Sequence, residues 1–241
     1  MEPEQRLNQM CVWHTVAFFG SARIVATARA RAELEALEAS SAAERSIELA
    51  RRRLELSRYY DEARILARML TTWSLSLPEY EQLVVCSGGG GGIMEAANRG
   101  ASEAGGRTVA LNIRLPFEQA ANPYVQEELT FDFHYFFMRK FWFLYRAKAA
   151  VIFPGGFGTL DELLELLTLM QTGRMEKRIP IVIYGREYWE RVINLAAMAE
   201  AGTISEADLD LFLHADTPEE AFAAIRDAFT YLAVPDSANS R

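Results

Sequence analysis

A glycine-rich turn at 154–158 is followed, after two intervening residues, by a pair of acids, and this combination suits a reaction on a bound anion. The apolar run 149–153 before it predicts a buried strand, and Thr159 opens a predicted helix with leucines at helical spacing. The free N–H groups and positive dipole end of such a helix bind anions, and phosphate is the natural ligand. Asp161 and Glu162 lie in the first turn beside this site, so an anion and a carboxylate would share it.

A second glycine turn, at 88–92, repeats the arrangement earlier in the chain. It follows the apolar run 83–86 and precedes a predicted helix that starts at Ile93. Neither turn has the G-x-G-x-x-G spacing of dinucleotide-binding proteins, and the sequence contains no Gly-Lys pair for a Walker A loop. The usual sequence support for hydride transfer and for ATP hydrolysis is therefore missing.

The rest of the sequence predicts an α/β domain that would position both turns. We expect a flexible lead-in at 1–13, a single domain at 14–232 with a helical, Arg-rich insertion at about 24–57, and a flexible tail at 233–241. Alternating strands and helices give a mainly parallel, doubly wound sheet in three α/β/α layers, and ligands bind beyond the carboxyl ends of its strands. The predicted strands are 14–19, 83–86, 108–113, 129–133, 149–153, 179–184 and 211–214.

Composition narrows the classes of partner. The 241 residues are half hydrophobic and carry a net charge of −8, which argues against nonspecific binding of nucleic acid. No apolar run reaches the roughly 20 residues that span a bilayer, and the N-terminal residues have no apolar signal core. Cys11 and Cys86 give no disulfide framework, and the three histidines lack metal-ligand spacing. We therefore expect a cytoplasmic protein without a metal or other cofactor and without nucleic-acid or membrane partners.

Four features of the sequence resemble the Lonely Guy (LOG) family, which was long labelled lysine decarboxylase-like. Residues 154–162, PGGFGTLDE, resemble the family's PGGxGTxxE signature, and residues 87–94 resemble its GGGxxG-I/L-M turn. Arg139 and Lys140 match its RK pair. The resemblance covers roughly residues 14–184, and Gly20 and Ser21 match the loop after the family's first strand. The chain departs from the family by having Gly91 where relatives often have Pro, and by its insertion at about 24–57.

The resemblance implies a Rossmann-like fold and an activity. Characterised members are phosphoribohydrolases that cleave cytokinin riboside 5′-monophosphates, and often AMP, into free base and ribose 5-phosphate. The family's catalytic pair carries over onto Arg139 and Glu162. The candidate substrate-binding residues are Gly20, Ser21, Gly88, Gly89, Gly90, Met94, Lys140, Gly155, Gly156, Gly158 and Thr159.

Such a reaction explains why an acid stands beside a phosphate site. Cleavage of a ribosyl–adenine bond passes through an oxocarbenium-like state with positive charge on the sugar. A nearby carboxylate stabilises that charge or activates the water that attacks the sugar. Glu162 would lie within reach of the ribose, while the 5′-phosphate would bind at the turn. Arg139 would keep Glu162 ionised and oriented, because a neighbouring guanidinium lowers a carboxyl pKa by about 1–3 units. Lys140 would contact phosphate or ribose.

Each of these residues also has a purely structural interpretation. Thr159 and Glu162 have the spacing of a capping box, which stabilises a helix by about 1 kcal/mol. Arg139 and Lys140 could belong to a buried ion pair. Met94 could pack in the core, and Asp161 could be a solvated acid at the helix start.

Other functions remain open at this stage. Lysine decarboxylation would need pyridoxal phosphate on Lys140, Lys148 or Lys177, none of which lies in a recognisable motif. A nucleotide sensor without turnover and transfer of ribose phosphate to an acceptor other than water are further alternatives. The aromatic segment 134–148 is apolar nearly all round, so the core or a partner chain must cover it. We expect a homodimer or a higher homo-oligomer.

Overall fold

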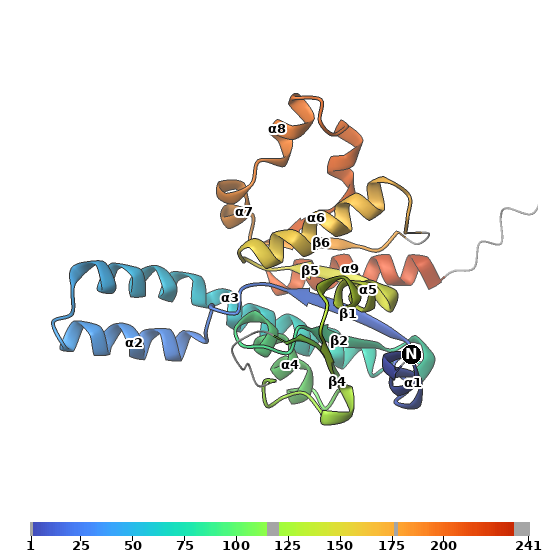
Figure 1. Ribbon diagram of the computed structural model, residues 1–241, viewed down its shortest axis with the longest axis horizontal. Coiled ribbons are helices and arrows are strands. Elements are labelled where there is room, and N and C mark those ends of the chain that lie inside the picture. Colours follow the sequence, from blue (N-terminus) through green and yellow to red (C-terminus); the bar gives the residue numbers. More distant parts are fainter. Residues whose placement is uncertain (1, 115–120, 176–177, 234–241) are drawn as a thin grey trace, which may run out of the picture.

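One parallel sheet organises the part of the chain that the computed structural model describes, residues 2–114, 121–175 and 178–233. Within these residues, seven strands lie side by side in the order β4-β3-β2-β1-β5-β6-β7 (Figure 1). Every neighbouring pair is parallel, so the predicted doubly wound α/β fold is confirmed. The strands are β1 His14–Phe19, β2 Leu83–Ser87, β3 Thr108–Ile113, β4 Thr130–Phe133, β5 Ala147–Ile152, β6 Ile181–Tyr184 and β7 Leu213–Ala215.

The strand order reverses next to β1. Val16 on β1 pairs with Val85 of β2 on one side and with Ala149 of β5 on the other. The connections from β1 and from β5 therefore leave in opposite directions, and a crevice opens beyond the carboxyl ends of these two strands. Both predicted glycine turns begin at this edge of the sheet, because they follow β2 and β5.

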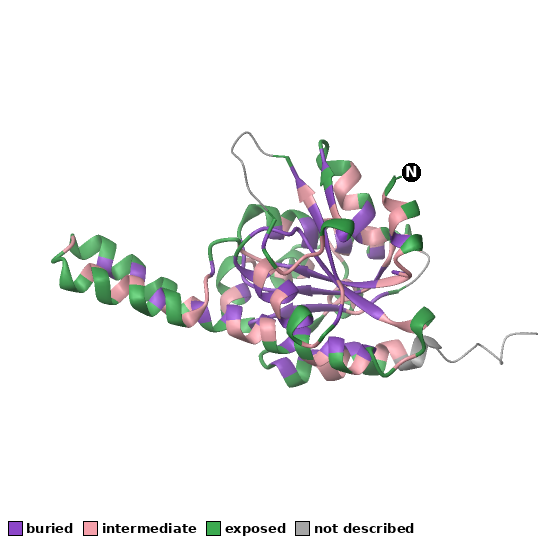
Figure 2. Cartoon of the chain, turned by 90° about the horizontal axis from the view of Figure 1, so that it is seen from below, coloured by how far each residue is buried: buried purple, intermediate pink, exposed green. Residues whose placement is uncertain are grey.

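Two layers of helices cover the faces of the sheet. Alternate residues of β1 face opposite layers: Ala17 packs with α1, α5, α6 and α7, whereas Val16 packs with α3, α4 and α9. The strands are buried almost throughout (Figure 2). None of the described helices is long and apolar enough to cross a membrane. The helices are α1 Glu2–Gln9, α2 Thr27–Ala39, α3 Glu44–Ser74, α4 Ile93–Glu103, α5 Phe136–Tyr145, α6 Phe157–Gln171, α7 Arg186–Val192, α8 Leu195–Glu200 and α9 Pro218–Ala233.

The helical insertion forms an antiparallel hairpin of α2 and the first half of α3, which projects from the body (Figure 1). Ion pairs join its two helices: Arg51 to Glu38 and Arg53 to Glu33, each at 2.9 Å. Helix α3 has 31 residues and continues past the predicted end of the insertion, at about 57, into the core. The segment contains no glycine or proline that would end it.

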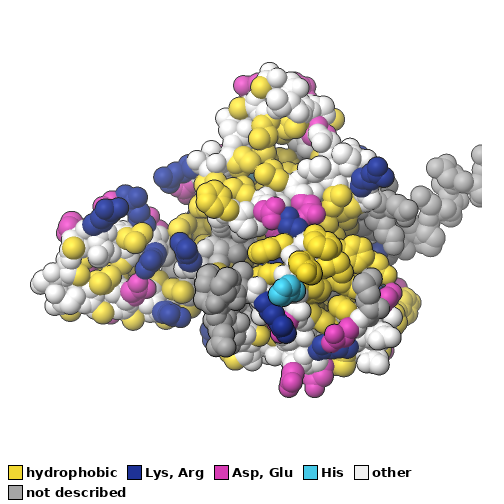
Figure 3. All heavy atoms as spheres, viewed as in Figure 1, with side chains coloured by type: hydrophobic (Ala, Val, Ile, Leu, Met, Phe, Trp, Pro, Cys, Tyr) yellow, Lys and Arg dark blue, Asp and Glu magenta, His cyan; other side chains and the backbone are white. Residues whose placement is uncertain are grey.

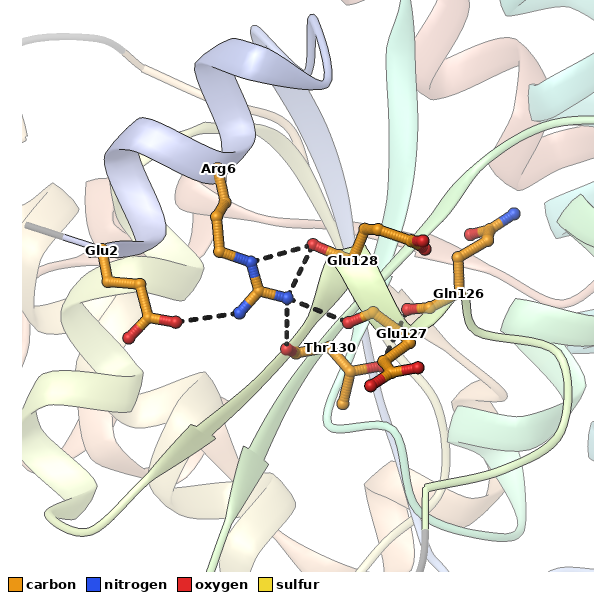
Figure 4. Close-up of polar contacts among 6 residues, drawn as sticks. All are labelled: Glu2, Arg6, Gln126, Glu127, Glu128 and Thr130. Atoms are coloured by element: carbon orange, nitrogen blue, oxygen red, sulfur yellow. Dashed lines mark hydrogen bonds and ion pairs between the residues drawn. The ribbon is translucent and has the colours of Figure 1, made fainter.

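The N-terminal lead-in that we expected to be flexible forms α1 instead. Leu7 is buried against the sheet, and Arg6 donates hydrogen bonds to the carbonyl oxygens of Glu127, Glu128 and Thr130 at 2.8–3.1 Å (Figure 4). These contacts join α1 to the start of β4 and the turn before it, 121–124 residues away, and nothing in the local sequence indicated them. The predicted tail lies outside the described residues from position 234 onward.

Two short helices, α7 and α8, follow β6. Asn194 begins the second of them by accepting a hydrogen bond from the N–H of Ala197 at 3.0 Å. An N-cap of this kind favours a new start over a continued helix.

The contact between α3 and α4 depends on a glycine, which leads to a stability prediction. A Cβ atom at Gly100 would lie 2.0 Å from the carbonyl oxygen of Arg64. Gly100→Ala should therefore lower the free energy of unfolding by about 1–3 kcal/mol, although alanine is the better helix former. Ser102→Ala, an exposed change on the same helix, should stay within about 0.5 kcal/mol of wild type. Urea unfolding measures both, and equal stability of the two variants would show that the helices separate at no cost.

Candidate functional site

Three loops meet at the carboxyl edge of the sheet. The loop after β1 lies between the two glycine turns: the N–H of Ser21 donates to the carbonyl of Pro154 at 3.0 Å, and the N–H of Ile93 donates to the carbonyl of Ser21 at 3.1 Å. A Cβ atom at Gly92, where φ is +66°, would lie 2.2 Å from the Ser21 oxygen. The close approach of these loops therefore requires glycine there.

A cavity of about 890 Å³ opens between these loops, α6, α7 and the base of the hairpin. Most of the residues singled out in the sequence line it, including both members of the candidate catalytic pair. Gly89, Gly90 and Lys140 do not line it. Those that do are Gly20, Ser21, Gly88, Met94, Arg139, Gly155, Gly156, Gly158, Thr159 and Glu162.

The turn after β5 presents the start of α6 to this cavity. The helix begins at Phe157, two residues before the predicted start, and no side chain caps its N-terminus. The capping-box interpretation of Thr159 and Glu162 is therefore wrong: Thr159 lies inside the helix, and Glu162 binds a different partner. Uncapped N–H groups of the first turn leave a site that suits an anion. At Gly155 a Cβ atom would lie 2.1 Å from the Thr159 hydroxyl oxygen, so a larger residue would distort the turn.

Arg139 and Glu162 form an ion pair in the wall of the cavity. Nη2 of Arg139, on α5, lies 2.8 Å from Oε1 of Glu162, on α6. The side chains are 15% and 6% exposed, so water screens the pair weakly. The Arg139 guanidinium also lies over the rings of Phe136 and Phe143, at 5.2 and 5.7 Å from their centroids. The sequence placed these two residues 23 positions apart, and the fold joins them.

The pKa of Glu162 is shifted in the direction opposite to our expectation. Burial raises the pKa of Glu162 above its ordinary value, and the lowering by Arg139, and then by Lys140, offsets only part of that increase. We expected the arginine to dominate and to lower the pKa. The low polarity of the site dominates instead, as it does for buried carboxyl groups in general. A raised pKa suits a group that must exchange a proton during a reaction.

Lys140 forms ion pairs beside the cavity without lining it. Its Nζ forms ion pairs with Asp161 at 2.8 Å and with Glu165 at 2.9 Å. Asp161 is therefore a partner of Lys140 rather than a merely solvated acid. The structure thus gives Lys140 two carboxylate partners, which hold α5 against α6 beside the Arg139–Glu162 pair.

A buried polar network supports the other glycine turn. The side-chain amide of Asn122 donates to the carbonyls of Gly89 and Gly90, both at 3.1 Å, and to Oδ1 of Asn98 at 2.9 Å. The hydroxyl of Ser87 donates to the same Asn98 oxygen at 2.7 Å. Gly89 has φ of +74°, which explains why glycine is needed at that position. Gly89 and Gly90 therefore shape the turn, while Gly88 and Met94 face the cavity.

Several residues of the cavity were not identified from the sequence. Tyr188 of α7 donates its hydroxyl hydrogen to the carbonyl of Gly155 at 2.8 Å and so braces the turn before α6. Leu49, Arg53 and Leu56 line the cavity from the hairpin. No motif marked these residues, because their proximity depends on how distant helices pack. Arg23 also lines the cavity. Its position two residues after the matched Gly20-Ser21 loop was the one feature of the sequence that could have indicated this.

Fold and site together define a parallel α/β protein with a crevice at its topological switch point, a helix N-terminus without a side-chain cap in that crevice, and a buried Arg–Glu pair in the crevice wall. A family model described as possible lysine decarboxylase matches residues 94–225, which is more than half of the chain. The chain belongs to this family, the one that the Lonely Guy resemblance indicated.

Curated relatives carry names that describe an activity. The chain is 27% identical over 154 residues to the probable cytokinin riboside 5′-monophosphate phosphoribohydrolase LOG4 of Oryza sativa subsp. japonica, covering 63% of this chain and 66% of the relative. It is 27% identical over 164 residues to the cytokinin riboside 5′-monophosphate phosphoribohydrolase LOG5 of Arabidopsis thaliana, covering 67% and 68%. The match therefore spans about two thirds of the length of these relatives.

A solved structure supports the fold alone. The molybdenum cofactor carrier protein MCP of Chlamydomonas reinhardtii superposes with a TM-score of 0.53 at 17% identity, covering 90% of this chain and 98% of the other. At that identity the similarity concerns architecture and not the ligand.

Proposed function

We propose that this protein is a phosphoribohydrolase that cleaves the N-glycosidic bond of nucleoside 5′-monophosphates. Its substrates would be cytokinin riboside 5′-monophosphates, AMP or both, and its products the free base and ribose 5-phosphate. The observation that carries the proposal is the buried Arg139–Glu162 pair in the wall of a cavity that also contains the uncapped N-terminus of α6. The names of the curated relatives point to the same reaction class.

The proposed mechanism uses these two features together. The 5′-phosphate binds at the first turn of α6, beside Gly155 and Thr159, which places the sugar toward Glu162. As the bond from C1′ to the base nitrogen breaks, its electron pair leaves with the base, and positive charge develops on the ribose. The Glu162 carboxylate stabilises that charge and accepts a proton from the water that adds to C1′. The departing base takes up one proton and Glu162 releases the one it accepted, so the carboxylate is regenerated and one water molecule is consumed for each nucleotide. Arg139 holds Glu162 in place.

Chromatography tests the proposal directly. Purified protein is incubated separately with AMP and with isopentenyladenosine 5′-monophosphate, and free base and ribose 5-phosphate are measured. Release of base from either nucleotide is the expected result, and the ratio of the two rates ranks the substrates. Binding without release from either nucleotide would instead favour a nucleotide sensor.

The family description raises lysine decarboxylation as an alternative. Lys140 forms ion pairs with Asp161 and Glu165, which engage its ammonium group and leave it poorly placed for a Schiff base. Purified protein should show no aldimine absorption band after incubation with pyridoxal phosphate and should release no CO₂ from lysine. Either signal would favour the decarboxylase over the hydrolase.

The exposed aromatic residues of α5 and its N-cap support a homodimer or higher homo-oligomer, which we also propose. Of the apolar side chains at 135–145, Trp142 and Phe143 are buried, whereas hydrophobic side chains gather on the outer face around α5 (Figure 3). Exposed apolar patches of this kind mark contact sites. The exposed residues are Tyr135, Phe136, Phe137, Phe141 and Tyr145.

Sedimentation tests this proposal. Wild-type protein at micromolar concentration should sediment as a dimer or larger species, and Phe137→Ser, at a side chain that is 67% exposed, should shift it toward monomer. Tyr80→Ser is a matched control, because Tyr80 is 65% exposed and lies on a different element. A monomeric wild type would refute the expected assembly.

A further inference from the structure

Three arginines line the cavity, and two of them are already neutralised. Arg139 is paired with Glu162 at 2.8 Å, and Arg53 is paired with Glu33 at 2.9 Å. Arg23 is the third, and in residues 2–114, 121–175 and 178–233 its guanidinium forms no ion pair. The cavity therefore contains a cation whose charge is available to a ligand.

The backbone fixes where this cation stands. Arg23 follows the loop that lies between the two glycine turns, and its N–H donates to the hydroxyl oxygen of Ser21 at 3.1 Å. A Cβ atom at Gly155 would lie only 3.1 Å from the Ser21 nitrogen, so this loop directly adjoins the turn before α6. The next residue, Ile24, is buried, which anchors the chain on the other side of Arg23. Arg23 thus stands at the edge of the anion site on a short segment fixed at both ends.

The charge that the proposed substrate brings is larger than the helix end can balance. A nucleotide 5′-phosphate carries close to two negative charges, whereas a helix N-terminus supplies about half a positive charge. Glu162 adds negative charge nearby when it is ionised, and the charges of Arg139 and Lys140 are balanced by carboxylates. A planar guanidinium can donate two parallel hydrogen bonds to one phosphate group.

We infer that Arg23 binds the 5′-phosphate of the substrate and is the residue by which the site prefers nucleoside monophosphates to nucleosides. This inference rests on the proposed function for the identity of the ligand, but it concerns binding and not bond cleavage. Neither the family model nor the names of the relatives assign this residue.

Calorimetric titration of the full chain with AMP, inorganic phosphate and adenosine tests the inference. Arg23→Ala should weaken binding of AMP and of phosphate about 10- to 100-fold, the range for a hydrogen bond to a charged group. Binding of adenosine should stay unchanged, and Arg23→Lys should restore part of the affinity for AMP. Arg29→Ala is the matched control, because Arg29 is also exposed but does not line the cavity, and it should bind AMP as wild type does.

The outcomes separate this inference from the proposed function. If Arg23→Ala binds AMP and phosphate as tightly as wild type, or loses adenosine binding equally, the inference is wrong. Wild-type protein that binds neither AMP nor phosphate would overturn it as well. Arg23-dependent AMP binding without release of adenine would support the inference while refuting the hydrolase. Circular dichroism of each variant shows whether a loss of affinity comes from unfolding.

Discussion

Glu162→Gln should lower the rate of base release about 100-fold or more while nucleotide binding stays largely intact. Glutamine keeps the size of the side chain and one hydrogen-bond acceptor for Arg139, but it carries no negative charge and cannot take a proton from water. The loss falls in the range for removal of a positioned acid–base or electrostatic group. Because the Glu162 side chain is only 6% exposed, water cannot take the place of its carboxylate. The measurement is kcat for AMP, together with the Kd by calorimetry.

Glu165→Gln provides the matched control for this prediction. Glu165 lies less than one turn further along α6 and forms an ion pair with Lys140, but it does not line the cavity. Its replacement should change kcat less than about threefold. Base release by Glu162→Gln at the wild-type rate would remove this carboxyl from the chemistry, whatever the control shows.

Arg139→Gln is the second change for which we expect a large effect. Arg139 is the largest influence that lowers the pKa of Glu162, so its removal should raise that pKa further. In wild type, burial should place the acidic limb of the kcat/KM profile above the ordinary glutamate pKa of about 4.3. In the variant this limb should move to higher pH, and kcat/KM at neutral pH should fall about 10- to 100-fold. A pH profile of kcat/KM from about pH 4 to 9 measures both effects.

The stability of the Arg139→Gln variant should also depend on the protonation of Glu162. The native variant holds the proton of Glu162 more tightly than the unfolded chain does, so its stability should fall as pH rises from the unfolded pKa through the folded pKa. Thermal unfolding at several pH values measures this loss. Arg64→Gln is the control, because it breaks the ion pair between Arg64 and Glu103, away from the cavity. It should leave the acidic limb of the pH profile in place. A limb that does not move in Arg139→Gln would mean that the arginine does not control Glu162.

Much of the fold follows from local patterns in the sequence. The buried strands read as continuous apolar runs, and glycine turns after β2 and β5 mark where two of them end. The boundaries that were wrong depend on contacts between distant residues. Helix α1 is held by Arg6 on the start of β4, and no property of residues 2–9 reveals that partner.

In the candidate site, too, motifs identified some residues, whereas others could be found only from the arrangement of distant helices. Arg139 and Glu162 were identified from motifs, and the structure brings them to 2.8 Å. The pKa of Glu162 was misjudged, because a motif names the neighbouring charge but does not show how deeply the carboxyl is buried. Tyr188 and the hairpin residues of the cavity were missed, because they reach it only through the arrangement of α3 and α7 around the sheet.

The projecting hairpin has a practical consequence for engineering. Its tip, where Ser40 and Ser41 join α2 to α3, is exposed. About five residues of α3, or roughly 8 Å of helix, separate the start of α3 from Leu49 at the cavity, and about nine residues, or roughly 13 Å, separate it from Arg53. A fluorescent label or a small inserted domain at this tip would therefore project away from the sheet and leave the cavity open. The same helix continues into the core, so the attachment would remain rigidly connected to the body and could report distances within an assembly.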